Sequence, residues 1–495
     1  MSRIALFLAI TVTIISPCLS QADPLSSRQI PQSVVQIFVQ SNPAELDAPW
    51  IGVGVESTSG SGVIIEGNRI LTAAHVVDDA LSIEIKRPGL PRRYVARVEQ
   101  FGHECDLAIL SVEREEFFEG TVPMPLGGTP KVEDEVRVYG FPVGGDALSV
   151  TSGIVSRAEV SFYAHSMRKL LLLQIDAALN PGNSGGPVVS EGTLAGISMQ
   201  LLDGAENVGY IIPAAVIAHF LEDLKEHGCV LGFPSLGVTV QPITNDALRQ
   251  EYALAPEQDG ALVVGVNYGD SASGHLEPGD VIIAVDGIRV AEDLTVPVDG
   301  FGRLNFSYLI QTKQVGEETS LEVLRGGQKR HEVISLKNVP SLVPGTHHVT
   351  NNSFYVFGGL VFQPLTLEYL FLYDDCETWI PGELSIYGLT RNFRTPERDQ
   401  VIMLTSVLPA PINRGYQDYE DEVVASVNGR IPRDMRDLLS IVENAKGPRL
   451  RILMESGAVL VLDLERARAD QGGILKSHRL PSECSVGLKE DQKQQ

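Results

Sequence analysis

The sequence predicts a mostly β protein made of several domains. Its 495 residues are enough for about two to four domains of ordinary size. Short runs of strand-forming residues, bounded by turn residues, fill the chain from Ser33 to about Tyr210. Farther on, the strand–turn–strand stretch at 278–290 resembles the one at 419–432, which indicates two copies of one module of about a hundred residues.

Residues 1–22 have the pattern of a cleaved signal peptide. Arg3 precedes the apolar run 4–15, and small residues stand before a cleavage site near Ala22. Because the run is short for a bilayer, we expect no membrane span in the mature chain; a membrane anchor, or a lipid link at Cys18, stays an open alternative. The pattern predicts an exported, periplasmic protein.

The first domain is expected over residues 23–230 as an all-β barrel or sandwich, because its strands are short and helical stretches between them are few. A helix over 213–228 should close this domain. Its apolar side chains share one face, with Pro213 suited to the first turn and Gly228 to the position after the last. The expected strands are 33–39, 60–67, 81–86, 107–112, 135–141, 170–175 and 193–199.

Two smaller modules should follow, at 231–340 and 350–480. Each has a hairpin with Asp-Gly or Asn-Gly at its turn, then a helix-like segment, then a final strand pair. The stretch between the modules is interpreted as a linker. The polar tail 481–495 is expected to be disordered.

Charge and composition exclude some classes of partner and cofactor. A net charge of −24 repels phosphate backbones and anionic lipids, so nucleic acid is excluded as the main partner. No stretch resembles a nucleotide-binding loop, so no ATP requirement and no cofactor are expected.

Cysteines and histidines give no metal-site pattern. None of the four cysteines after residue 22 forms a CxxC pair; three disulfide pairings are open, and isolated thiols are at least as compatible. His103, His347 and His348 are interpreted as surface-loop residues, so no metal is expected. The four cysteines are Cys105, Cys229, Cys376 and Cys484.

Three short stretches supply the parts of a serine nucleophile site. A serine hydroxyl needs a base within hydrogen-bond reach, and the base needs an orienting carboxylate. "LTAAHVV" places His75 just after a predicted strand, "DLAIL" places Asp106 at the head of another, and "NPGNSGGP" holds Ser184 among glycines and prolines. Each stretch alone has a structural explanation, but the three together favour catalysis.

These stretches resemble the signatures of the HtrA/Deg family of serine proteases, here as "TAAHVV", "DLAIL" and "DAALNPGNSGGPV". The resemblance covers nearly all of the chain after residue 22. It implies a chymotrypsin-like double β-barrel protease domain followed by two PDZ domains, and a homo-trimer or a multiple of trimers. The stretches "GFGRLNFSYLIQTK" and "GGLVFQPLTLEYL" are most similar to the plant Deg branch, which has an atypical second PDZ domain.

The resemblance also implies the role of each residue in the site. Ser184 would attack the scissile carbonyl, His75 would accept and return the proton, and Asp106 would orient the imidazole. The oxyanion hole would comprise Gly182, Asn183 and Ser184, with backbone N–H groups from the first and third. Glycine at position 182 lets the peptide turn its N–H inward at little steric cost.

The expected substrate pocket carries no charge. Ala178, six positions before the nucleophile, would lie at the pocket base with Leu179 beside it, which predicts a small or medium aliphatic residue before the cut. Ile197, Ser198 and Met199 would pair with the substrate backbone as an added strand.

Each PDZ module is expected to present a loop that binds a peptide carboxylate. In the first module the loop is Leu236, Gly237 and Val238. In the second, a weaker match, it is Gly358, Gly359 and Leu360, and a role in assembly is slightly favoured for that module.

The function expected from these features is an exported, ATP-independent serine endopeptidase of protein quality control. It would cleave unfolded or damaged proteins, and its first PDZ module would bind peptide C-termini. The alternative is a latent protease fold that works mainly as a holdase or peptide-binding protein.

Overall fold

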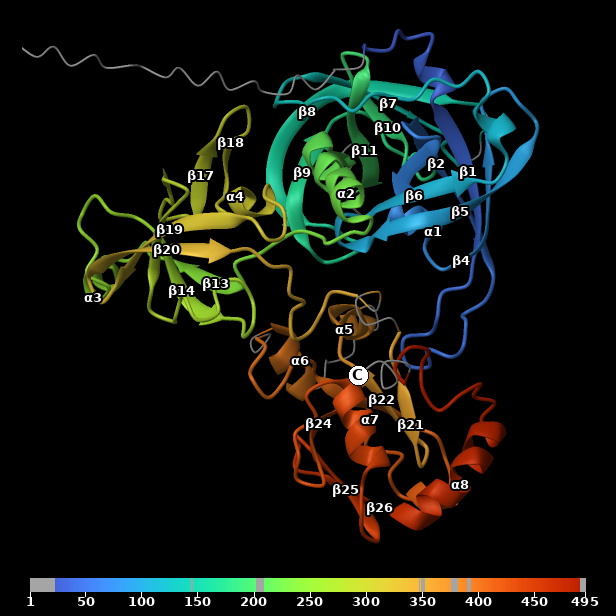
Figure 1. Cartoon of the computed structure of the whole chain (residues 1–495), viewed down its shortest axis with the longest axis vertical. Coiled ribbons are helices and arrows are strands. Elements are labelled where there is room, and N and C mark those ends of the chain that lie inside the picture. The colour runs from blue at the N-terminus through green and yellow to red at the C-terminus, as the bar shows by residue number, and fades with distance from the viewer. Residues whose placement is uncertain are drawn as a thin grey trace, which may run out of the picture.

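A computed structural model describes residues 23–143, 145, 147–201, 209–346, 348, 352–374, 382–389 and 393–489. The chain forms three units, which follow the colour gradient of Figure 1 from blue-green through yellow to red. The second and third units each contact the first, and they also contact each other where Arg394 donates its N–H to the Asn267 side chain. The predicted signal segment, 1–22, lies outside the described residues.

The first unit consists of two closed six-stranded barrels, which confirms the predicted double β-barrel. In one barrel the strand order is β1-β2-β3-β6-β5-β4, and in the other β10-β11-β12-β9-β8-β7. The strands of the first barrel are β1 (Val34–Ser41), β2 (Glu56–Ile65), β3 (Arg69–Ala73), β4 (Ala80–Lys86), β5 (Arg93–Gly102) and β6 (Leu107–Val112). Those of the second are β7 (Glu135–Gly140), β8 (Ser149–Phe162), β9 (Lys169–Ile175), β10 (Pro187–Ser190), β11 (Thr193–Leu201) and β12 (Gly209–Pro213).

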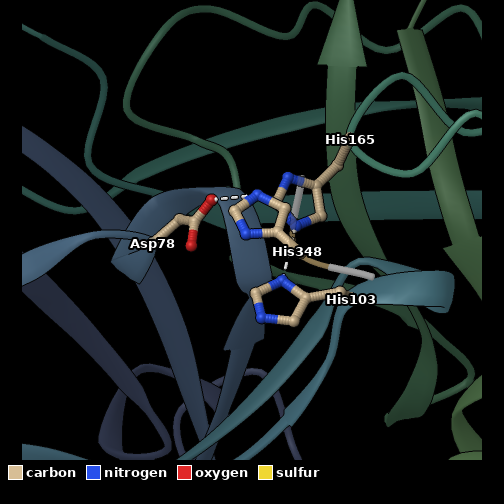
Figure 2. Close-up of side chains that lie close together, drawn as sticks. All are labelled: Asp78, His103, His165 and His348. Carbon is tan, nitrogen blue, oxygen red and sulfur yellow. Dashed lines mark hydrogen bonds and ion pairs between the residues drawn. The ribbon is translucent and has the colours of Figure 1, made fainter. Parts of the chain in front are cut away.

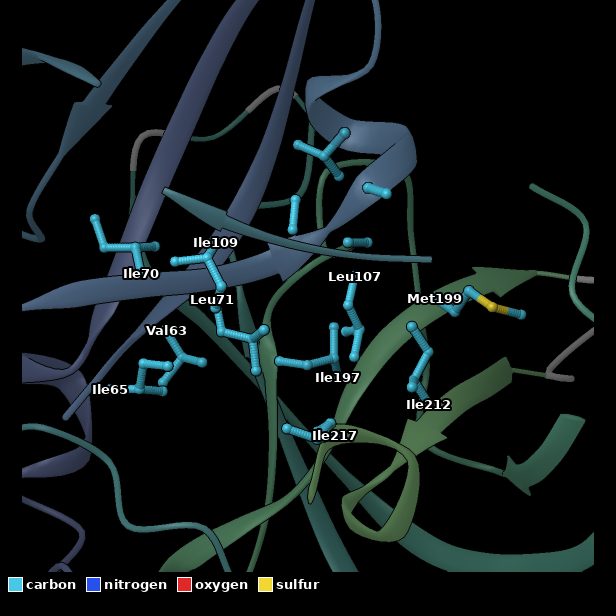
Figure 3. Packing of buried hydrophobic residues seen from close by; sticks show 14 of the residues in the cluster. Val63, Ile65, Ile70, Leu71, Leu107, Ile109, Ile197, Met199, Ile212 and Ile217 are labelled. Carbon is cyan, nitrogen blue, oxygen red and sulfur yellow. The ribbon is translucent and has the colours of Figure 1, made fainter. Parts of the chain in front are cut away.

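One continuous hydrophobic core joins the two barrels. Figure 3 shows Leu71 and Leu107 of the first barrel near Ile197 of the second and Ile217 of the closing helix. All four side chains are fully buried. Because the barrels share this core, residues on facing barrel edges are held at fixed separation.

The closing helix α2 (Ala214–His227) follows its sequence prediction. Pro213 precedes it, and Gly228 ends it in the left-handed conformation with its N–H donated to the Leu224 carbonyl at 3.0 Å. Phe220 and its neighbours on the same face are buried in the first core.

The second unit is a small sheet of order β13-β14-β15-β19-β20 with β16 paired to β15, plus the two-stranded sheet β17-β18. The helix-like segment expected near 302–313 is only partly helical, because its first residues extend the hairpin before α4 begins. The elements are β13 (Val238–Pro242), α3 (Asp246–Glu251), β14 (Ala261–Val266), β15 (Val281–Val285), β16 (Ile288–Arg289), β17 (Thr295–Val298), β18 (Gly302–Asn305), α4 (Ser307–Gln311), β19 (Glu318–Arg325) and β20 (Gln328–Ser335).

The third unit is a six-stranded antiparallel sheet of order β21-β22-β23-β24-β25-β26, with helices around it. Its elements are β21 (Tyr355–Phe357), β22 (Leu360–Pro364), α5 (Leu367–Asp374), α6 (Gly382–Leu389), β23 (Ile402–Val407), β24 (Glu422–Val427), α7 (Met435–Glu443), β25 (Arg449–Met454), β26 (Val459–Asp463) and α8 (Leu464–Ser477).

The expected disordered tail is ordered as far as Lys489. Cys484 forms a β-bridge with Tyr355, and Leu488 is buried in the core of the third unit. These two apolar side chains anchor an otherwise polar segment, which is why composition alone misjudged it. Residues 490–495 lie outside the described part.

The predicted linker between the second and third units packs against both the third unit and the first barrel. Leu342 and Val343 are buried against α5 of the third unit, and residue 348 lies against the first barrel.

Among the described helices, none combines the length and hydrophobicity that a membrane crossing requires. Cys105, Cys229 and Cys484 are free thiols, and Cys376 lies outside the described residues.

Candidate active site

His75 and Asp106 are brought together by the pairing of β3 with β6. The register places Ala73 opposite Leu107, so the turn after β3, which carries His75 in α1 (Ala74–Val77), lies beside the turn that ends at Asp106. The Nδ1 atom of His75 is 2.7 Å from Oδ2 of Asp106, and its backbone N–H donates to Oδ1 at 2.9 Å. Both carboxylate oxygens therefore fix the position of one histidine.

The electrostatics of this pair favour a charged carboxylate and a basic imidazole. Burial alone would raise the pKa of Asp106, but the charge and hydrogen bonds of His75 hold it below its usual value. Burial alone would lower the pKa of His75; the charge and hydrogen bond of Asp106, with the more distant charge of Asp78, raise it above its ordinary value. His75 is thus prepared to accept a proton.

Ser184 lies in the turn between β9 and β10, at the junction of the barrels. Its carbonyl accepts the Ser61 N–H at 2.9 Å, which joins the turn to β2. Its hydroxyl donates to the Met199 carbonyl at 2.9 Å. Within the part of the chain that the structure describes, no hydrogen bond joins Ser184 to His75, so the Met199 carbonyl and not the imidazole is the partner of the hydroxyl.

The turn before Ser184 has a defined orientation. Gly182 has φ of +97°, and a Cβ there would lie 2.4 Å from the Phe141 carbonyl oxygen. The Pro181 carbonyl accepts the Val143 N–H at 2.8 Å, and in a trans peptide the Gly182 N–H points the opposite way. The Asn183 N–H is already used, because it donates to the Asn180 carbonyl at 3.0 Å.

His75 and Ser184 line one cavity of about 470 Å³. Of the expected pocket residues, Leu179, Ser198 and Met199 line it as well. Ala178 does not; it is exposed, and its carbonyl accepts the Thr151 hydroxyl. Ile197 is fully buried in the shared core. The described lining contains no carboxylate, lysine or arginine; besides the residues named above it consists of Ala164, His165, Asn180, Pro181 and Asn183.

The expected strand-like pairing with substrate can involve only part of the predicted segment. The Ser198 backbone N–H donates to the Gly186 carbonyl, and the Ser198 carbonyl accepts the Gly185 N–H. Ile197 already pairs with Ile212 of β12. The pairing of β11 with β12 shifts register after Ser198, at Met199, so the backbone of Met199 stands outside the regular ladder.

Comparisons with known proteins agree with this geometry. The family described as "Trypsin-like peptidase domain" matches residues 60–197, and "PDZ domain" matches 343–487. Protease Do-like 4, mitochondrial, of Arabidopsis thaliana is 38% identical over 91% of this chain and 84% of its own length. Putative protease Do-like 3, mitochondrial, of the same plant is 37% identical over 93% and 80%. A variant of the HtrA-type protease AlgW solved with a decapeptide has a TM-score of 0.50 and 25% identity, over 63% of this chain and 96% of that one.

The chain belongs to the HtrA/Deg (Do-like) family of serine proteases. It is accordingly a serine endopeptidase with a trypsin-like domain and a PDZ domain.

The expected periplasmic location is wrong for this Do-like protease. Relatives similar to it over most of their length are named as mitochondrial, and another, Protease Do-like 2, as chloroplastic. The first 22 residues contain no acidic side chain, a property that organelle transit peptides share with export signals. The pattern therefore could not distinguish the two destinations.

The first predicted carboxylate loop of the Do-like protease is open to a cavity. Leu236, Gly237 and Val238 line a space of about 650 Å³, together with α4 and with Lys169 and Leu170 of β9. Gly237 has φ of +68°, and a Cβ there would meet the Asp270 carboxylate at 2.2 Å. The groove is therefore shared between the second unit and the protease barrel.

The second predicted loop is closed from within. Gly358 and Gly359 form the two-residue turn between β21 and β22, and Leu360 pairs with Val407. The Gly358 N–H donates to the side chain of Gln471 at 3.0 Å, and its carbonyl accepts from Asn413 at 2.9 Å. Because the Gly358 N–H already has a partner, it is not available to a peptide carboxylate in this conformation.

Sequence reasoning missed a second cluster beside the active site. Asp78, His103, His165 and His348 come from four separate segments, and one ligand atom of each lies within 4.8 Å of those of the others. His103 and His348 were expected in surface loops without a metal. No spacing in the sequence links the four residues, so only the fold could show that they meet.

Proposed function

We propose that Ser184 is the nucleophile of this protease, His75 its general base and Asp106 the carboxylate that orients His75. The observation that carries the proposal is the 2.7 Å pair of His75 and Asp106 in the same cavity as Ser184. In this arrangement His75 accepts the serine proton during attack and returns it to the leaving amine.

The backbone N–H groups of Gly182 and Ser184 serve as the oxyanion hole. The Pro181 carbonyl points toward Val143, which does not line the cavity. The Gly182 N–H belongs to the same trans peptide and points the opposite way, which supports its assignment as a donor. The hydrogen bond of the Asn183 N–H to Asn180 excludes Asn183 as a donor in this conformation. Each such donor is worth about 3–4 kcal/mol of transition-state stabilisation.

A resting state follows from the position of the serine hydroxyl. It donates to the Met199 carbonyl rather than to His75, so it must give up that hydrogen bond and turn toward His75 before it can react. This observation also favours the second candidate function, a latent protease fold that holds unfolded polypeptides without cutting them. Substrate that pairs with the backbone at Met199 would compete for that carbonyl and release the hydroxyl.

The substrates are unfolded or damaged proteins, cut without ATP after a small or medium aliphatic residue. The uncharged lining by Leu179 and Met199 supports the aliphatic preference.

The second unit, 231–340, acts as a PDZ domain that binds peptide C-termini at Leu236, Gly237 and Val238. The protease domain covers 23–230 and the atypical PDZ domain 350–480. A homo-trimer or multiple of trimers rests on family resemblance alone.

The test incubates the purified full chain with unfolded casein, beside Ser184→Ala. We expect wild-type cleavage and a drop of about 10⁶-fold in the variant, because the nucleophile is removed. Mass spectrometry of the products gives the residue before each cut, and light scattering of the same samples gives the oligomeric state. Cleavage by Ser184→Ala would refute the nucleophile, and cuts mainly after Arg or Lys would refute the pocket assignment. Tight casein binding without cleavage by either protein would establish the holdase.

A further inference from the structure

The cluster of Asp78, His103, His165 and His348 is compact and partly buried. Figure 2 shows the three imidazoles and the carboxylate lying close together. The Nε2 atom of His348 is 2.7 Å from Oδ2 of Asp78, and Nδ1 of His103 is 3.0 Å from Nε2 of His165. The rings of His103 and His348 are stacked at 4.3 Å.

The atoms that face one another are those that bind transition metals. Three imidazole nitrogens and one carboxylate oxygen are a ligand set that zinc accepts in tetrahedral geometry. With bonds of about 2.0–2.1 Å, neighbouring ligand atoms of a tetrahedral zinc lie about 3.3 Å apart. The observed separations of 2.7 and 3.0 Å and the upper limit of 4.8 Å bracket that value, so rotation of the side chains can bring the four atoms to it.

The cluster shares two turns with the active site. Asp78 directly follows α1, which carries His75, and His103 begins the 3-10 turn η2 (His103–Cys105) that ends at Asp106. His165 lines the catalytic cavity, and its ring centre is 6.4 Å from that of His75. His348, in contrast, belongs to the linker before the third unit. The cluster is therefore the place where that linker meets the turns that hold the catalytic pair.

We propose that Asp78, His103, His165 and His348 bind one divalent transition-metal ion, with zinc the best match, and that this ion fastens the linker to the protease barrel. Without an ion, the four side chains pair among themselves through the His348–Asp78 and His103–His165 contacts. With an ion, each contributes one bond to a common centre. Binding of the ion does not depend on the proposed catalytic roles, so the two can fail separately.

The first experiment measures metal binding by the full-length protein after chelator treatment. Zn²⁺ is titrated by calorimetry, and Co²⁺ by its visible absorption, which is strong when four ligands surround the ion as a tetrahedron. We expect one ion per chain with the tetrahedral cobalt spectrum, displaced by zinc. Absence of stoichiometric zinc binding, or a cobalt spectrum typical of six ligands, would overturn the proposal.

Variants then locate the ion. His348→Ala and His165→Ala should each weaken zinc binding by at least about tenfold, since even groups that only support a metal ligand commonly contribute 10- to 100-fold. His331→Ala is the matched control, because His331 is an exposed histidine on β20 and is not one of the four clustered residues. If an alanine variant does not fold, Asp78→Asn and His165→Gln replace it. Unchanged binding in any folded variant of the four residues would contradict the assignment.

The fastening role has its own measurement. Hydrogen exchange of residues 339–346 should slow when zinc is added to the wild-type chain, because His348 is then held at the barrel. The slowing should be absent in His348→Ala and present in His331→Ala. Zinc binding without any change in exchange of this segment would leave the ion site in place and refute the fastening.

Discussion

Opposing electrostatic effects of burial and of nearby carboxylates act on the pKa of His75. Burial disfavours its charged form, whereas Asp106 in direct contact and Asp78 farther away favour it, and the balance raises the pKa. The ring of His165 also faces it, at 6.4 Å between centres. In the proposed mechanism the neutral imidazole accepts the serine proton, so the raised pKa of His75 would set the lower limit of the working pH range.

The pH dependence of casein cleavage should show this directly. Because His75 must be neutral, activity is lost as pH falls through its raised pKa, with the midpoint above the ordinary histidine value of about 6.5. Asp106→Asn should move the midpoint down and lower kcat by about 10⁴-fold, as in the serine protease triad. An unchanged midpoint of kcat in Asp106→Asn would show that Asp106 does not control His75.

At the scale of elements, the turn 180–187 depends on how β2 and β7 hold it. The Ser61 hydroxyl donates to the Gly182 carbonyl at 2.8 Å and accepts the N–H of Phe141, which follows β7, at 2.9 Å. This bridge between the barrels fixes the peptide on one side of Gly182, while the bond between Val143 and Pro181 fixes the other. The serine is thus presented by contacts from both barrels, and not by its own loop alone.

Gly182→Ala tests that fixed turn. The added Cβ would lie 2.4 Å from the Phe141 carbonyl oxygen and 2.9 Å from the Val143 nitrogen, so the peptide must shift and its N–H must leave the oxyanion position. We expect kcat to fall by about 10²–10³-fold, the usual cost of losing one oxyanion donor.

The matched control for that substitution is Gly228→Ala. Gly228 also has positive φ, +71°, but nothing lies within 4 Å of its added Cβ. We expect this variant to lose about 1–2 kcal/mol of stability, the cost of a side chain in the left-handed conformation, and to keep its kcat. Equal losses of kcat in the two variants would mean that backbone strain, and not the oxyanion geometry, explains the effect.

At the scale of the whole molecule, the second unit packs on the protease barrel beside the groove that we propose binds peptide C-termini. Gln311 of α4 accepts the Leu171 N–H of β9 at 2.8 Å, and Lys131 pairs with Asp299 of the β17–β18 hairpin. Lys169 of β9 lines the groove with Gly237. A peptide bound there would therefore contact the protease barrel as well as the second unit.

Peptide binding to the full chain carrying Ser184→Ala should depend on a free C-terminus. An aliphatic peptide with a free carboxylate should bind at least about tenfold more tightly than its amide, because charge-assisted hydrogen bonds are lost in the amide. Gly237→Ala should abolish the difference, since its Cβ would meet Asp270 at 2.2 Å.

Gly316→Ala is the control for peptide binding. It lies in the same unit at φ of +95°, with nothing within 4 Å of the added Cβ, and should keep the preference for the free acid. Equal affinity of the wild-type groove for acid and amide would refute the carboxylate loop.

The sequence was sufficient where a local pattern determines the result. Ser184 among glycines, and His75 and Asp106 at strand ends, could be selected as candidates because each local context is distinctive, and the structure brings His75 to Asp106 and to the cavity that Ser184 lines. His165 could not be connected to His348, because 183 positions separate them and only the packing of the linker brings them together. The turn at Gly358 has the sequence of a binding loop, but the sequence does not show that the Gly358 N–H donates to the side chain of Gln471 in α8.

The central claim is that a reactive hydroxyl at position 184 depends on the imidazole at position 75. The most direct measurement treats the folded, peptide-stimulated full chain with a serine-reactive fluorophosphonate and maps the adduct by mass spectrometry. Our account predicts one adduct, on Ser184, that is lost in His75→Ala while the protein stays folded. A stimulated protein that remains unmodified, or an adduct on another serine, would contradict it.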